Sequence, residues 1–76
     1  MPTFFFHLIR DGCRIEDGEG LDLPDVTAAF TEALRSAENF VREAVRQGER
    51  YPAHLEVTDK AGKLLLTAAL PWPDLH

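Results

Sequence analysis

The sequence predicts an α+β fold, a two-layer domain with a four-stranded, mainly antiparallel sheet and one long amphipathic helix on one face. Three observations predict it. Residues 23–48 have the pattern of a single helix, residues 3–16 have the pattern of a β-hairpin before it, and residues 53–70 form a second hairpin pattern after it. The order β-β-α-β-β fits one domain, and a chain of 76 residues is too short for two. We place the domain at residues 1–70 and expect residues 71–76 to form an extended tail.

The first hairpin begins with an aromatic run. Residues 3–10 divide into two largely apolar faces, which is typical of a strand inside a sheet. Asp11-Gly12 provides the two positive-φ positions of a tight hairpin turn. A shorter strand follows at residues 13–16, and Asp17-Gly18-Glu19-Gly20 ends it.

The long helix has clear start and stop signals. Leu23 precedes a proline and therefore favours an extended backbone, so we expect the helix to start after it with Asp25 as the N-cap. Gly48 fits the position just after the helix, and Pro52 prevents its continuation. Apolar residues recur at spacings of three and four and form one continuous stripe: Val26, Ala29, Phe30, Ala33, Leu34, Ala37, Phe40, Val41, Ala44 and Val45.

The second hairpin closes the predicted sheet. Residues 53–58 alternate, with Leu55 and Val57 on one face and His54 and Glu56 on the other. The segment from Asp59 to Gly62 predicts a type I turn closed by a glycine in the left-handed region. Residues 63–70 are apolar on both faces.

The composition excludes several functional classes. The formal net charge is −5, whereas nucleic acids and anionic membranes bind positively charged surfaces. The longest apolar runs, 4–6 and 64–66, are far too short to cross a bilayer. Cys13 is the only cysteine, so we expect no disulfide within the chain and a reducing compartment, the cytoplasm. No motif indicates a cofactor, and we expect none.

The distribution of apolar residues predicts self-association. One helix covers one face of a sheet, here the face of Phe4, Phe6, Leu8, Leu55, Val57, Leu64 and Leu66. The other face is too apolar to remain in water, and the helix is longer than the strands. A second copy in a two-fold dimer would cover the surplus. The predicted interface consists of Phe5, Ile9, Leu65 and Ala69.

The same face also carries the candidate chemical groups. His7, His54 and Glu56 would lie on one side of the sheet, where two imidazoles and a carboxylate suit a divalent metal or acid–base chemistry. The alternative is that these are half-buried polar residues of a dimer interface, and we favour it. Cys13 follows a tight turn, but a reactive thiol needs a base or positive field nearby, and only Arg14 is adjacent. We interpret Cys13 as a small apolar residue of a short strand.

Motifs spread over nearly the whole chain resemble a known family. The opening Met1-Pro2 and Phe6-His7-Leu8 precede Asp11-Gly12, and Leu23-Pro24-Asp25 starts an alanine-rich helix. Further positions continue the pattern: Asp17, Gly20, Ala28, Ala29, Glu32, Ala33, Leu55, Val57, Asp59, Gly62 and Leu65. Together they resemble a family of short uncharacterised bacterial proteins described as a domain of unknown function. The resemblance implies no activity.

Three functional hypotheses follow from the sequence. The first is a non-catalytic, self-associating interaction module, a homodimer that can also bind an unidentified protein partner but neither nucleic acid nor membrane. The second is a small-ligand or metal-binding protein, an enzyme included, that uses His7, His54 and Glu56. The third is a regulatory module of the antitoxin type, which only an analogy of fold supports.

Overall fold

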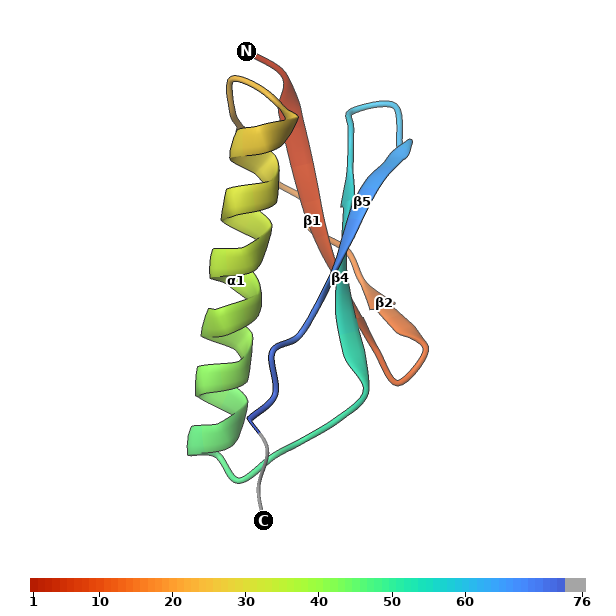
Figure 1. Cartoon of the computed structure of the whole chain (residues 1–76). Coiled ribbons are helices and arrows are strands. Elements are labelled where there is room, and N and C mark those ends of the chain that lie inside the picture. Colours follow the sequence, from red (N-terminus) through yellow and green to blue (C-terminus); the bar gives the residue numbers. More distant parts are fainter. Residues whose placement is uncertain (74–76) are drawn as a thin grey trace.

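One helix lies against one face of an antiparallel sheet in the computed structural model, which describes residues 1–73 (Figure 1). This arrangement confirms the predicted α+β fold. The structure adds one short strand, between the first hairpin and the helix, that the sequence pattern did not indicate. The elements in chain order are β1 (Thr3–Arg10), β2 (Cys13–Ile15), β3 (Leu21–Asp22), α1 (Val26–Arg46), β4 (Ala53–Thr58) and β5 (Leu64–Ala69).

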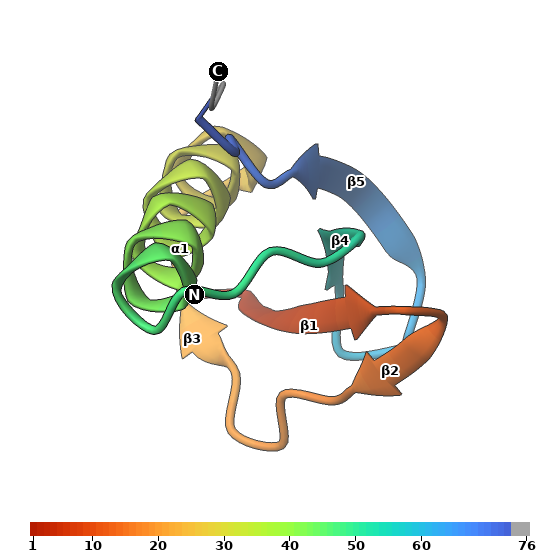
Figure 2. The ribbon, with the colours of Figure 1, turned by 90° about the horizontal axis from the view of Figure 1, so that it is seen from below.

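The strands form a sheet with the order β2-β1-β4-β5, and β3 pairs with the first residues of β1 (Figure 2). Phe6 lies opposite Val57 and Leu8 lies opposite Leu55. Side chains alternate between the two faces of a strand, so the residues between these point the other way. His7, which lies opposite Glu56, therefore belongs to the face turned away from the helix.

Local signals in the sequence set the ends of the helix and the first turn. The Asp25 carboxylate accepts a hydrogen bond of 2.8 Å from the amide of Ala28, which confirms the expected N-cap. Gly48 follows the helix with a φ of +74°, in the left-handed region that favours glycine. Asp11 and Gly12 have φ values of +51° and +79°, as the predicted hairpin turn requires.

The core joins small helix residues to larger strand residues. The buried residues of α1 are Ala29, Ala33, Ala37, Val41 and Ala44, and they pack over β4 and β5. The large apolar residues of the helix remain exposed instead: Val26, Phe30, Leu34, Phe40 and Val45. Alanine side chains let the helix backbone approach the sheet closely, and the longer side chains then project past the contact on either side. The apolar stripe is thus only partly buried, which agrees with the surplus expected from the length of the helix. The exposed part consists of its large side chains and not of one overhanging end.

The last strand contributes to the core differently from the prediction. Leu64, expected on the helix-covered face, is 51% exposed. An irregularity in the pairing between Val57 and Thr58 shifts the start of β5, and Leu64 lies opposite Thr58. Ala68, opposite Leu55, and Leu70 occupy the core in its place.

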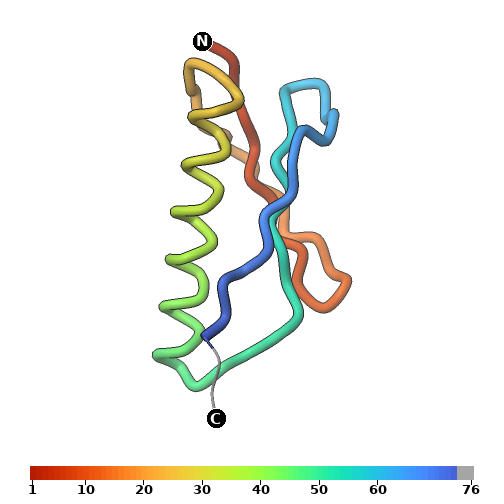
Figure 3. Tube along the Cα trace, viewed as in Figure 1, coloured from red at the N-terminus to blue at the C-terminus, as the bar shows by residue number. Residues whose placement is uncertain are grey.

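The segment after β5 continues along the helix toward its C-terminal end (Figure 3). Trp72 packs edge-on against Tyr51, with the ring centroids 5.3 Å apart. The Arg50 guanidinium donates a 3.0 Å hydrogen bond to the carbonyl of Pro73. Residues 71–73 of the expected tail therefore contact the domain, whereas residues 74–76 lie outside the described part of the chain.

Candidate functional site

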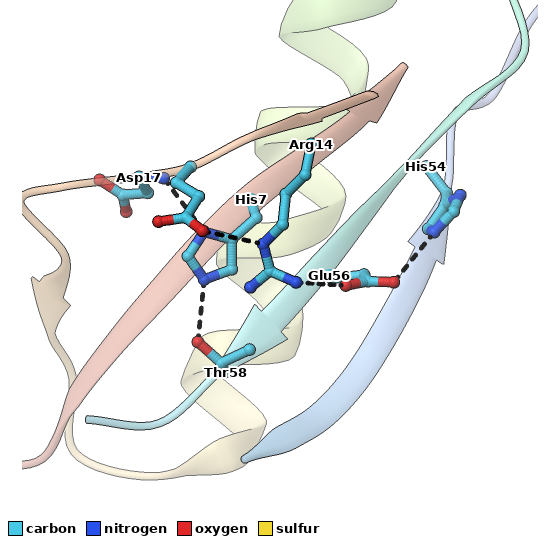
Figure 4. A network of polar contacts seen from close by, with 7 residues as sticks. His7, Arg14, Asp17, His54, Glu56 and Thr58 are labelled. Atoms are coloured by element: carbon cyan, nitrogen blue, oxygen red, sulfur yellow. Dashed lines mark hydrogen bonds and ion pairs between the residues drawn. The ribbon is translucent and has the colours of Figure 1, made fainter. Parts of the chain in front are cut away.

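Polar side chains gather on the sheet face turned away from the helix (Figure 4). The structure brings His54 and Glu56 together, with 3.3 Å between His54 Nε2 and Glu56 Oε2. The other oxygen of Glu56 accepts a 3.2 Å bond from Arg14, which reaches over β1 from β2. Arg14 also lies 3.6 Å from the Glu16 carboxylate. These contacts form one row of polar and charged side chains across the sheet.

His7 belongs to a separate network. Its ring is buried, and its Nδ1 accepts a 3.1 Å hydrogen bond from the backbone amide of Asp17. An amide only donates, so Nδ1 carries no proton in this arrangement. The neutral ring therefore holds its proton on Nε2, which lies 2.9 Å from Thr58 Oγ1 and donates to it. Of the three predicted site residues, only His54 and Glu56 contact each other.

The hydrogen bonds of His7 limit what it can do chemically. A metal ion would have to displace either Thr58 or the Asp17 amide, because both ring nitrogens are in use. A base for Thr58 would need a free lone pair on Nε2, where the proton sits. The Thr58 side chain is itself buried. Within residues 1–73, no group of three or more His, Cys, Asp or Glu residues is arranged to hold a metal.

Asp17 organises the loop beside His7. Its carboxylate accepts hydrogen bonds from the amides of Glu19 at 3.0 Å, Gly20 at 3.1 Å and Phe6 at 3.2 Å. Phe6 lies in the stretch of β1 between the residues paired with β3 and those paired with β2. The carboxylate thus supplies the acceptor that a neighbouring strand would otherwise provide there.

The contacts of Asp17 determine its acidity. Burial acts to raise the pKa of its carboxyl group, because it disfavours the charged form. The amides of Gly20, Phe6 and Glu19 donate hydrogen bonds that stabilise the carboxylate and outweigh this effect, so the pKa of Asp17 lies below its ordinary value. The ionised carboxylate is therefore the form that holds the loop against β1.

Gly20 lets this loop pass close to β1. Its φ is +74°, and a Cβ at this position would lie 2.8 Å from side-chain atoms of both Phe5 and Thr3. Only glycine fits both the backbone conformation and the space. The loop therefore lies close against the side chain of Phe5, which is one of the predicted interface residues.

A comparison with protein families assigns the chain to a family. A family model described as Domain of unknown function (DUF6894) matches residues 3–71, which include every helix and strand of the structure. The chain belongs to this family. No curated protein and no solved structure shows significant similarity to it. The family description names no activity, so any function has to be argued from the arrangement of this DUF6894 domain.

The predicted interface residues of the DUF6894 domain differ in exposure. Phe5, Ile9 and Leu65 are half-buried and Ala69 is exposed. Phe5 also stacks on the His7 ring, with the centroids 6.4 Å apart. The large exposed apolar side chains lie mainly elsewhere, on α1. The sequence predicts surplus apolar surface on the helix but does not identify these residues as its source. The available signal was the four-residue spacing, which puts Ala29, Ala33 and Ala37 in one row of the stripe and the larger Val26, Phe30 and Leu34 in the row beside it.

The remaining sequence candidates give no reactive centre. Cys13 is exposed on β2. The guanidinium of its neighbour Arg14 contacts the carboxylates of Glu16 and Glu56, so its charge is shared with two carboxylates.

Within the described residues, no helix combines the length and the hydropathy that a membrane crossing requires.

Proposed function

We propose that this domain is a non-catalytic interaction module that associates with itself. The observation that carries the proposal is the apolar ridge of α1, formed by Val26, Phe30 and Leu34. These residues are 49%, 47% and 44% exposed. They are spaced four residues apart, so they form one row on the helix surface without an intervening charge.

The ridge favours a partner energetically. Covering apolar surface contributes about 25 cal/mol per Å² removed from water. Monomeric proteins seldom leave continuous apolar patches of more than a few hundred Å² in contact with water. The monomer buries the alanines of the helix and leaves its large apolar side chains about half exposed, so a partner that covers them removes further apolar surface from water.

The polar face of the sheet supports a role without catalysis. The His7 ring is used in structural hydrogen bonds, and Glu56 forms an ion pair with Arg14 and also contacts His54. None of the buried side-chain nitrogen and oxygen atoms described is left without a hydrogen-bond partner. An exposed single thiol at Cys13 fits a reducing compartment, and we place the domain in the cytoplasm.

The proposal is tested by the mass of the protein in solution. Sedimentation equilibrium and native mass spectrometry of the wild type are expected to give a dimer. Phe30→Glu places a charge in the apolar ridge and is expected to give a monomer. Thr31→Glu adds the same charge at the adjacent exposed position and is the matched control, expected to stay dimeric. A wild type that remains monomeric at every concentration, or a dimer that Phe30→Glu leaves intact, contradicts the proposal.

A further inference from the structure

The outer edge of β5 is free to pair. In the sheet order β2-β1-β4-β5, β4 lies on one side of β5, and no other described strand lies on its far side. An edge strand presents a row of backbone N–H and C=O groups that can bind another strand. A partner for this edge must therefore be an extended segment with free backbone N–H and C=O groups.

The composition of β5 does not oppose this pairing. Proteins protect edge strands with charges, prolines, bulges or very short length. β5 consists of six residues, LLLTAA, with neither a charge nor a proline. Its one irregularity lies at the beginning, beside Val57 and Thr58 of β4. Leu65 is the extra residue of this irregularity, and the regular stretch from Leu66 to Ala69 is uncharged.

Symmetry determines how β5 would meet its own copy. An antiparallel pair of identical strands requires a two-fold axis perpendicular to the sheet, so residues on the same face lie opposite each other. With the axis at Thr67, each Leu66 lies opposite Ala68 of the other copy. This register sets large side chains against small ones and Thr67 against itself, a favourable cross-strand pair.

The same axis brings the two helices together. It leaves both helices on one face of the joined sheet, and α1 packs over β4 and β5 near this edge. Val41 and Val45 line a hollow of about 320 Å³ with Pro71 and Pro73, the segment that follows β5. Leu34 lies two turns before Val41, so helical periodicity puts it on the side of the helix that lines this hollow. Figure 2 shows β5 and the segment after it beside α1.

We infer that β5 pairs antiparallel with β5 of a second copy about a two-fold axis at Thr67, which gives one continuous sheet with the apolar ridges of the two helices facing each other. This inference rests on the proposed function and names its contact. A single partner then satisfies both surfaces, the free strand edge and the exposed side chains of Phe30 and Leu34.

Cysteine cross-linking tests the register. In a Cys13→Ser background, Thr67→Cys places two thiols directly opposite each other, about 5 Å apart between Cα atoms, which suits a disulfide. Ala69→Cys is the matched control, because it lies exposed on the same strand but its two copies would be about 13 Å apart. Under mild oxidation Thr67→Cys is expected to form a covalent dimer at least about tenfold faster. Equal rates, or a faster reaction at Ala69→Cys, overturn the inference.

A charge variant separates this inference from the proposed function. Thr67→Lys sets two like charges opposite each other at an exposed position and is expected to raise the dimer dissociation constant at least about tenfold. Circular dichroism checks that the monomer stays folded. If the wild type is dimeric but neither Thr67→Lys nor Thr67→Cys has the expected effect, self-association stands and the β5 contact is wrong. If the wild type is monomeric, both proposals fail.

Discussion

The two edges of the sheet are built in opposite ways. On one side, the edge of β1 is covered by two short strands, β2 with three residues and β3 with two, and by the loop that carries Asp17. Where neither strand reaches, the Asp17 carboxylate binds the amide of Phe6. On the other side, β5 is a continuous uncharged strand. The chain itself covers much of the first edge, whereas no described strand covers the second, where we propose that a partner binds.

Charge accompanies the closed edge and is missing from the open one. Arg14 on β2 contacts Glu16 and Glu56, and Asp17 follows directly in the loop. Exposed pairs of this kind contribute only about 0.2–1 kcal/mol each to stability. Their effect on recognition is larger, because a second strand approaching this edge would have to displace charged, solvated side chains. The charges at the closed edge therefore affect which strands can pair there more than they affect the stability of the fold.

Replacing Asp17 is expected to have the largest effect on this comparison. Asp17→Ala leaves the amides of Phe6, Glu19 and Gly20 without their acceptor and is expected to lower the free energy of unfolding by about 3 kcal/mol. Urea denaturation measures the change. Asp17→Asn keeps one acceptor oxygen and should lose less than half as much. A loss below about 1 kcal/mol for Asp17→Ala would show that the loop is not held by this carboxylate.

The close passage of the loop over β1 gives the next largest effect. Gly20→Ala brings a Cβ to 2.8 Å from Phe5 and Thr3, and its φ is positive, so we expect a loss of about 2 kcal/mol. Gly62→Ala is the control, because Gly62 has a similar positive φ but open space around it. The difference between the two variants in thermal or urea unfolding isolates the steric contact. Equal losses would mean that only the backbone conformation matters.

Acidic pH should weaken the closed edge more modestly. Because the pKa of Asp17 is lower in the folded chain than in the unfolded one, the ionised carboxylate stabilises the fold at pH values above its ordinary pKa. That contribution is lost as the pH falls through the lowered value. We expect the stability difference between the wild type and Asp17→Asn to shrink as the pH is reduced from 7 to about 3. A difference that stays constant with pH would contradict this assignment.

Adding a divalent metal to the metal-free protein is expected to have the smallest effect. His54 and Glu56 form a pair, and His7 uses both of its ring nitrogens, so calorimetry of metal-free protein with zinc should show no binding tighter than about millimolar. His54→Ala serves as the control titration. Tight binding that His54→Ala abolishes would revive the ligand-binding hypothesis and direct attention to the polar sheet face.

Local sequence signals indicate some features of the candidate site and not others. His54 and Glu56 share a face because residues two apart on a strand always do, and this much could be predicted. The separation of His7 from them could not, because it depends on bonds to residues ten and fifty-one positions away. Asp17 could be assigned to a turn from its neighbouring glycines, but its bond to Phe6 depends on where the two short strands stop.

The sequence alone determined the order of the elements, the capped helix from Val26 to Arg46, and the hairpin turn at Asp11-Gly12, because each depends on residues a few positions apart. Only the tertiary structure decided which part of the apolar stripe is buried. Periodicity defines the apolar face of the helix. The alanines on that face set how closely the helix approaches the sheet, and the sheet is too narrow to cover the whole face. Phe30 and Leu34 lie outside that contact and therefore stay 47% and 44% exposed.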